Sequence, residues 1–223
     1  MTRILTSTLS LCAVLISGVS AYAFDAPDLT ANELAKLKQG EAIISVWKDR
    51  ERDKKPTISV GGIDIMTSAA KVYEIMLDCA RAAEISTDIR TCDVLETSPD
   101  GSWDVRKQKF AIGKFLPKIK TTFRTHYSTG ENGSHVMQIE KVSGDLKVQE
   151  GRWDIISLGP NQSRVIYQAA FKPAIPIPGK VIRKQVKKGI PDILYNLRGI
   201  AEADKAGNTN FVQNSTIYKT DDM

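Results

Sequence analysis

The stretch KPAIPIPGKVIRKQVKKGIPDIL, residues 172–194, decides the fold. It opens with three closely spaced prolines and continues into a segment, Pro178 to Asp204, whose apolar residues recur three and four positions apart. That spacing is the period of an amphipathic α-helix. The sequence therefore predicts a long C-terminal helix with one apolar face, formed by Ile182, Val186, Ile190, Ile193, Leu194, Leu197 and Ile200.

Five basic residues fall on another side of this predicted helix: Lys180, Arg183, Lys184, Lys187 and Lys188. Cations opposite an apolar stripe are typical of a solvated helix face. The formal net charge of +5 is low for a dedicated nucleic-acid-binding protein. We therefore expect no nucleic-acid partner, although weak, transient contact with an anionic membrane surface stays open.

Pro191 lies inside the predicted helix. A proline has no backbone N–H to donate to the carbonyl of Lys187, so we expect a kink or a local weakening there.

The first 23 residues have the features of an export signal. Arg3 precedes a mostly apolar segment, Ile4 to Val19, which is too short to span a bilayer, and Ala21-Tyr22-Ala23 forms an A-x-A cleavage site. We expect a periplasmic mature chain that begins at Phe24. At the other end, residues 205–223 are polar, lack periodicity and are predicted to form a flexible tail.

Removal of the signal, which contains Cys12, leaves Cys79 and Cys92. In an oxidising compartment, two cysteines this close in sequence are most simply a disulfide. A redox pair or a metal site is the alternative, but neither C-x-x-C spacing nor a set of further ligands is present.

The middle of the chain predicts a sheet. Residues 42–47 and 57–66 read as a hairpin, with Gly61-Gly62 as a bulge or bend, and Ser68 reads as the N-cap of a helix. From Thr91 to Lys172, about six strand-like segments alternate with D-G, N-G and similar turns, which indicates an antiparallel meander. The predicted class is α+β, a curved antiparallel sheet wrapped around the long C-terminal helix with a hydrophobic cavity between them.

Element order and short motifs resemble the helix-grip (SRPBCC) superfamily of START domains, polyketide cyclases and aromatases, and in particular its exported bacterial members. The motifs are GGIDIMTSAAKVYEIMLDC at 61–79, TCDVLE at 91–96, GRWDIISLGPNQSRVIYQ at 151–168, KPAIPIP at 172–178 and LYNLRGIAE at 194–202. The resemblance covers residues 40–204 and implies one START-like domain over residues 24–204. It also implies a deep apolar tunnel that holds lipids, sterols or other hydrophobic molecules.

Aromatic residues are the preferred ligand contacts, because their large apolar surfaces bury well against lipids and ring systems. The alternative for each is simple core packing, and Trp153 is expected to be a core anchor. The predicted ligand-binding residues are Phe110, Phe115, Phe123, Tyr127, Tyr167 and Phe171, with Ile182, Val186 and Leu194 on the helix.

No catalytic signature is present in the sequence. His126 and His135 are expected at the surface, and no G-x-S-x-G, P-loop or H-E-x-x-H motif occurs. We therefore expect no cofactor, no metal and no catalytic residue. Polyketide-acting members of the superfamily would place polar groups inside the tunnel; the candidates are Arg124, Tyr127, Tyr167 and Gln168, of which Arg124 and Gln168 fall on faces opposite the apolar ones.

Two loops have apolar tips beside lysines, GKFLPK at 113–118 and KPAIPIPGK at 172–180. Such tips either touch a headgroup layer or pack as ordinary loops. Together these patterns predict a periplasmic protein that binds, and carries between membranes, a hydrophobic ligand, with a lipid as the first candidate. The alternatives are a polyketide cyclase or aromatase acting on a hydrophobic substrate, and a structural protein whose tunnel is filled by its own side chains.

Overall fold

The computed structural model describes residue 24 and residues 27–111, 117–130 and 132–205. The predicted signal segment and most of the predicted tail lie outside the described residues. So do Phe115 and Leu116 of the first apolar loop.

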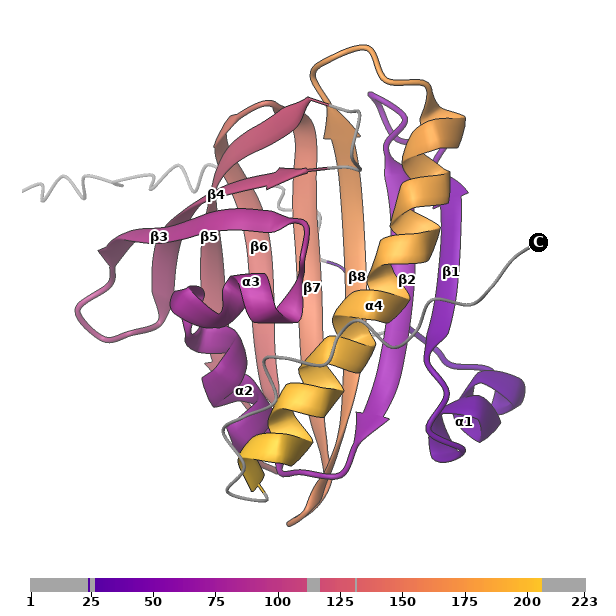
Figure 1. The fold of residues 1–223 in the computed structure, drawn as a ribbon, viewed down its shortest axis with the longest axis vertical. Coiled ribbons are helices and arrows are strands. Elements are labelled where there is room, and N and C mark those ends of the chain that lie inside the picture. Colours follow the sequence, from indigo (N-terminus) through magenta and orange to yellow (C-terminus); the bar gives the residue numbers. More distant parts are fainter. Residues whose placement is uncertain (1–23, 25–26, 112–116, 131, 206–223) are drawn as a thin grey trace, which may run out of the picture.

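Eight antiparallel strands form one curved sheet in the order β1-β2-β8-β7-β6-β5-β4-β3 (Figure 1). The last strand in the chain, β8, pairs with β2, so the N-terminal hairpin extends the meander that begins at β3. The strands are β1 (Ile43–Lys48), β2 (Thr57–Ile65), β3 (Ile89–Thr97), β4 (Trp103–Ala111), β5 (Lys118–Thr129), β6 (His135–Gly144), β7 (Leu146–Gly159) and β8 (Gln162–Pro173).

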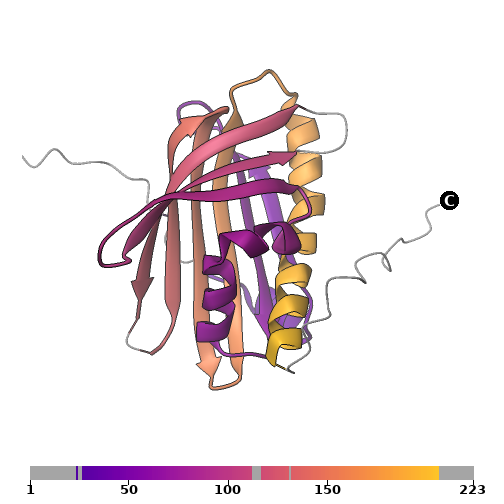
Figure 2. The ribbon, with the colours of Figure 1, turned by 60° about the vertical axis from the view of Figure 1, so that its left-hand side comes forward.

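The long helix α4 (Gly179–Lys205) lies across one face of this sheet, as the sequence predicts (Figures 1 and 2). Beside it on the same face are α2 (Ala69–Leu77), the 3-10 turn η1 (Cys79–Arg81) and the short helix α3 (Ala82–Ile85). The structure thus confirms the predicted class of a curved antiparallel sheet wrapped around a C-terminal helix.

Helix α1 (Ala31–Lys38) packs on the opposite face, where Leu37 is buried against Ile43 and Ile166. Its start follows the local sequence. The Thr30 side chain accepts a hydrogen bond from the backbone N–H of Glu33, and the Glu33 carboxylate accepts one from the backbone N–H of Thr30. This capping box satisfies helix N–H groups that would otherwise lack partners.

Gly61 and Gly62 do not form the predicted bulge, because β2 pairs without a register shift with both β1 and β8. Instead, the absence of a side chain at these two positions allows neighbouring residues to pack closely against β2. A Cβ on Gly61 would lie 2.8 Å from Cγ2 of Ile190, and one on Gly62 would lie 2.7 Å from Cδ1 of Ile166. The two glycines let α4 pack directly on β2 from one side and let β8 fill the space on the other.

The main core lies where α2 and the C-terminal part of α4 meet the sheet. Leu194 and Leu197 of α4 are fully buried there together with Val72 of α2 and Val165 of β8. The apolar stripe found in the sequence is therefore the face of α4 that contacts the sheet.

Cys79 and Cys92 form the predicted disulfide, with their Cα atoms 5.5 Å apart. The bond links η1 to β3. It fastens the η1–α3 segment to the outer strand of the sheet, beside the site described next.

Candidate functional site

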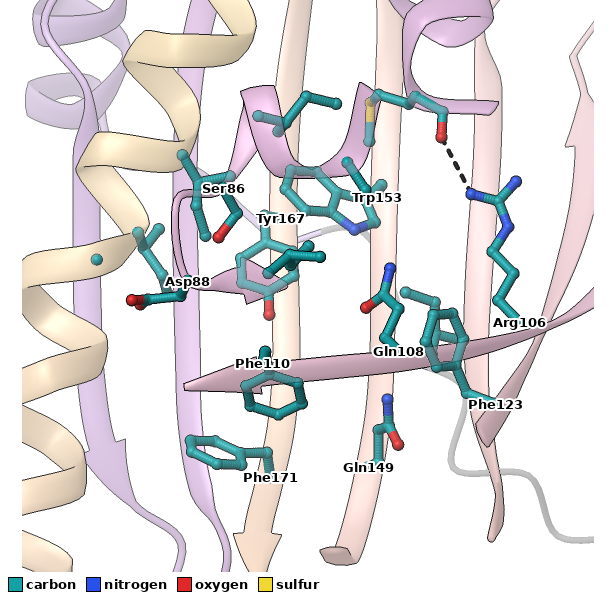
Figure 3. Close-up of a pocket in the computed structure, with 18 of the residues that line it drawn as sticks. Ser86, Asp88, Arg106, Gln108, Phe110, Phe123, Gln149, Trp153, Tyr167 and Phe171 are labelled. Carbon is teal, nitrogen blue, oxygen red and sulfur yellow. Dashed lines mark hydrogen bonds between the residues drawn. The ribbon is translucent and has the colours of Figure 1, made fainter. Parts of the chain in front are cut away.

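A cavity of about 320 Å³ lies between α4, the η1–α3 segment and the concave face of the sheet (Figure 3). Its wall is formed by residues from several strands of the sheet, from the segment between α2 and β3, and from α4. The aromatic part of the wall consists of Phe110, Phe123, Trp153, Tyr167 and Phe171. The volume is at the lower end of the roughly 300–1,000 Å³ range of small-molecule sites.

Five of the predicted ligand contacts line this cavity: Phe110, Phe123, Tyr167, Phe171 and Val186. They come from β4, β5, β8 and α4, and only the tertiary structure brings them together. Tyr127, Ile182 and Leu194 are not among the described lining residues, and Phe115 lies outside the described part of the chain. That any of them binds ligand stays a prediction.

Tyr127 is held by a buried polar network instead. Its hydroxyl donates to Asp104 at 2.6 Å and accepts from Arg106 at 2.8 Å. Burial, followed by the bond to Asp104, raises the pKa of Tyr127 above its usual value. The ring also meets Tyr73 of α2 edge to face, at 6.1 Å between centroids.

Arg106 completes this network and joins the sheet to α2. Its guanidinium contacts the Asp104 carboxylate at 2.9 Å and donates to the backbone carbonyls of Met76 and Leu77 at 3.3 and 2.9 Å. Asp104 and Arg106 are each only 6% exposed. The guanidinium therefore satisfies carbonyls at the C-terminal end of α2 that have no partner within the helix.

Leu194 packs against β2, where a Cβ on Gly61 would lie 3.3 Å from its Cδ1. Ile190 packs even closer to the same glycine and also lines the cavity. Val186 and Ile193, half-buried on the same helix, face open space and line the cavity.

Trp153 packs against the main core, as the sequence predicts, and also lines the cavity. Its ring is tilted against that of Tyr167, with centroids 4.3 Å apart. Burial raises the pKa of Tyr167 to about 12, against the opposing effect of a hydrogen bond with Ser59. This phenol therefore stays protonated at neutral pH.

Three glutamines in the described wall, Gln108, Gln149 and Gln185, were missed by the sequence analysis. Gln108 lies between Arg106 and Phe110 at every second position of β4, so all three share a face of the sheet. That alternation was the available signal. The polar candidates named instead, Arg124 and Gln168, are absent from the described lining, in line with their predicted position on the opposite face.

Asp88 lies at the edge of the cavity, near Gly189 of α4 (Figure 3). Burial raises the pKa of its carboxyl group; Asp192 adds to the rise and Arg90 opposes it. It is one of three charged residues among the described lining residues, with Asp78 and Arg106.

The histidines lie outside this wall. His126 is exposed, with Nε2 3.3 Å from the Glu140 carboxylate. His135 is half-buried rather than at the surface, because its ring stacks on Tyr73 at 4.2 Å, and burial lowers its pKa. Across the described ranges, no group of three or more His, Cys, Asp or Glu side chains is placed to hold a metal ion.

The two parts of α4 on either side of Pro191 are held differently. After Pro191, side chains bond to the rest of the protein: Arg198 donates to the Gly40 carbonyl at 2.7 Å, Glu202 accepts from the Met66 N–H at 2.9 Å, and Arg81 donates to Asp204 at 2.7 Å. Before it, no side chain of residues 179–190 forms a hydrogen bond or ion pair with another described residue. The half of α4 that covers the cavity is thus held by apolar contact.

Among the described residues, no helix combines the length and the apolar character needed to cross a membrane.

A family model described as polyketide cyclase / dehydrase and lipid transport matches residues 65–198. No curated protein sequence matches the chain. Solved structures with a similar fold include human STARD10, 13% identical with a TM-score of 0.62 over 82% of this chain and 83% of that one. The STAR-related lipid transfer protein of Xanthomonas axonopodis is 15% identical, with a TM-score of 0.59 over 71% of this chain and 98% of that one.

The Zhui aromatase/cyclase of Streptomyces sp. R1128 is also similar, at 14% identity and a TM-score of 0.53 over 68% of this chain and 98% of that one. At these identities the three structures show a shared fold.

Proposed function

Because this chain belongs to the polyketide cyclase / dehydrase and lipid transport family, we propose that it binds a hydrophobic ligand, and specifically a lipid, in the cavity under α4. The proposal places this activity in the bacterial periplasm, where the protein carries its ligand between membranes. The periplasmic location rests on the export-signal pattern of residues 1–23.

The observation that carries this proposal is an open, largely apolar space in the middle of the fold, with five aromatic residues in its wall. A protein with a purely structural role would fill that space with its own side chains, since interiors are normally close-packed. Apolar ligand surface removed from water there contributes about 25 cal/mol per Å² to binding. The volume of about 320 Å³ suits a single chain or a compact ring system better than a complete two-chain lipid.

Ligand entry is proposed to occur by movement of residues 179–190. This half of α4 covers the cavity with Val186 and Gly189, and Pro191 interrupts the backbone hydrogen bonds at its base. Because the other half is pinned by Arg198, Glu202 and Asp204, the helix can open at one end while the part of the core after Pro191, which includes Leu194 and Leu197, stays in place.

Contact with an anionic membrane surface is proposed for the same half of α4. Its exposed lysines, Lys180, Lys184, Lys187 and Lys188, pair with no described carboxylate. Attraction to an anionic leaflet is worth about 1 kcal/mol per basic residue at the surface. The neighbouring loop contributes less apolar surface than its sequence suggested, because Ile175 packs against Ile119 and Leu146.

A polyketide cyclase or aromatase is the second candidate, since the description of the matched family model names polyketide cyclases beside lipid transport. Tyr167, Gln108 and Gln149 are the cavity groups that could orient a poly-carbonyl substrate. Carriage is preferred because Arg106, the cation among the described lining residues, is already bonded to Asp104 and two backbone carbonyls.

Purification of the mature protein from its native host, followed by solvent extraction and mass spectrometry, tests the proposal. A stoichiometric lipid is expected. Recovery of a poly-carbonyl compound or its cyclised product would favour the enzyme. A protein that retains nothing and binds no hydrophobic probe would contradict both.

A further inference from the structure

Three glutamines line the described wall of the cavity; Gln185 belongs to α4, and the other two come from the sheet, with their amide groups near aromatic rings. Gln108 and Gln149 lie among Phe110, Phe123 and Phe171 (Figure 3). They come from β4 and β7, which are not neighbours in the sheet, and so reach the cavity from different parts of its wall.

Each amide has one end without a hydrogen bond to another described residue. Oε1 of Gln149 accepts from the Thr121 hydroxyl, which leaves its Nε2 open. Nε2 of Gln108 donates at 3.4 Å to the sulfur of Cys92, a weak acceptor, which leaves its Oε1 open. Turning either amide over exchanges its nitrogen and oxygen but still leaves one end open.

Neither open end is among the fully buried unpaired atoms of the described residues, so water can reach both in the empty cavity. An amide from which a ligand displaces that water without replacing its hydrogen bond loses free energy. A ligand that hydrogen-bonds to it removes this cost, whereas a purely hydrocarbon ligand makes the cost permanent. One open donor and one open acceptor match a hydroxyl group, which donates and accepts, and a carbonyl group matches the donor.

The charges around the cavity do not suit an anionic ligand group. Arg106 is neutralised by Asp104 and bonded to the carbonyls of Met76 and Leu77. The remaining charged residues of the described wall, Asp78 and Asp88, are both acidic. A phosphate or carboxylate inside would meet these carboxylates without a free cation to offset the repulsion.

We propose that the cavity selects an uncharged hydrophobic ligand with a hydroxyl or carbonyl group, and that Gln108 and Gln149 bind that group. This inference rests on the proposed function, since it specifies the ligand class for the same cavity. The lysines on the outside of α4 face solvent and guide the protein to a membrane surface, so they do not set the charge of the bound molecule.

The test compares twelve-carbon ligands that differ only in their head group. The protein is first titrated with N-phenylnaphthylamine, an uncharged dye that fluoresces in apolar sites, and the dye is then displaced with dodecanol, dodecanoate, dodecyl phosphate or dodecane. The titration is done at about pH 8, where dodecanoate and dodecyl phosphate are ionised. Dodecanol is expected to displace the dye at a concentration roughly tenfold lower than each of the other three compounds.

The outcomes separate the two proposals. If neither the dye nor any twelve-carbon compound binds, the proposed function is wrong. If the dye binds but dodecanoate, dodecyl phosphate or dodecane competes as well as dodecanol, the protein is a hydrophobic binder and the proposed selectivity is wrong.

Gln108→Leu and Gln149→Leu test the residues. Each is expected to remove most of the roughly tenfold preference for dodecanol over dodecane, while dye affinity changes little. Gln138→Leu is the matched control, because Gln138 lies on β6 outside the described wall. An unchanged preference in both cavity variants would overturn the assignment.

An NMR titration of the unaltered protein covers the case in which a variant does not fold. The side-chain amide signals of Gln108 and Gln149 are expected to shift with dodecanol and not with dodecane. Equal shifts with the two compounds would contradict the proposal.

Discussion

The two ends of the space between α4 and the sheet differ sharply, although the same strands form both. At the α2 end, the side chains of Asp104, Arg106 and Tyr127 form hydrogen bonds with one another. Arg106 also donates to two backbone carbonyls of α2. At the cavity end, two and four residues further along β4, Gln108 and Phe110 face open space.

The helix above the sheet follows the same division. The part of α4 after Pro191 is tied down by hydrogen bonds from residues such as Arg198, while the part before it rests on apolar contact. One end of the sheet face therefore serves stability and the other serves binding. Four predictions test this division, from the largest expected effect to the smallest.

Arg106→Met should have the largest effect on stability. It leaves the Asp104 carboxylate buried without its cation, and removal of one member of a buried ion pair typically costs about 3–5 kcal/mol of unfolding free energy. Urea denaturation followed by circular dichroism measures the loss.

The control for Arg106→Met is Arg90→Ala on the exposed edge strand β3, which should change stability by less than about 0.5 kcal/mol. Adding Asp104→Asn to Arg106→Met should restore part of the lost unfolding free energy, because the buried carboxylate that had no cation is then removed. A stable Arg106→Met protein that no longer binds the dye would instead assign Arg106 to the binding end.

Replacement of Cys79 and Cys92 by serine should come next. The disulfide closes a loop with a sequence separation of 13, and loss of such a crosslink is expected to cost about 3 kcal/mol, mainly by freeing the unfolded chain. Thermal unfolding with and without a reducing agent measures it. The agent should destabilise the unaltered protein and leave the double-serine variant unchanged; a response of the variant would show that reduction acts elsewhere.

Val186→Trp should weaken dye binding with little change in stability. The larger side chain enters the cavity from α4 and takes up space that the ligand needs, so affinity for N-phenylnaphthylamine should fall by roughly tenfold or more, equivalent to about 1.4 kcal/mol. The matched control is Val181→Trp, on the exposed side of the same helix. Equal binding losses in the two variants would mean that the dye binds to the outside of α4.

Asp88→Asn should have the smallest effect and a definite pH dependence. The folded protein raises the pKa of Asp88 above its ordinary value of 3.8, so the folded state binds the proton more tightly than the unfolded state does. Stability contributed by this group is therefore lost as pH rises from the unfolded pKa through the folded pKa.

Asn carries no such charge. The variant should match the unaltered protein at about pH 3, where Asp88 is protonated in both states. At neutral pH it should be more stable by a few tenths of a kcal/mol, because Asp88 is partly solvated and the effect is screened. Denaturation midpoints over this pH range measure the difference, and a variant that is less stable at neutral pH would show that the carboxylate has a favourable partner.

Much of the fold was predictable because its signals are local. The period of residues 182–200 defines α4 and its buried face, and the alternation in β5 and β8 identifies the face that turns towards the helix. The pairing of Cys79 with Cys92 needed only their number and the expected compartment.

The site was less predictable because two residues with the same local pattern met different partners. Tyr127 and Tyr167 are both aromatic, and each lies on the face of its strand that points towards the helices. Tyr127 meets Asp104 and Arg106 below α2, whereas Tyr167 lines the cavity beside Trp153. No spacing within either strand distinguishes these two outcomes.

The sequence by itself determined the elements, their buried faces and the Cys79–Cys92 crosslink, since these depend on neighbours along the chain and on composition. Only the tertiary structure decided where α4 rests on the sheet. The missing side chain at Gly61 lets Ile190 and Leu194 pack directly on β2, while Val186 and Ile193 of the same helix line the cavity. The cavity, and the amides of Gln108 and Gln149 that face into it, follow from that placement, because a cavity is a property of the distance between elements and not of any one of them.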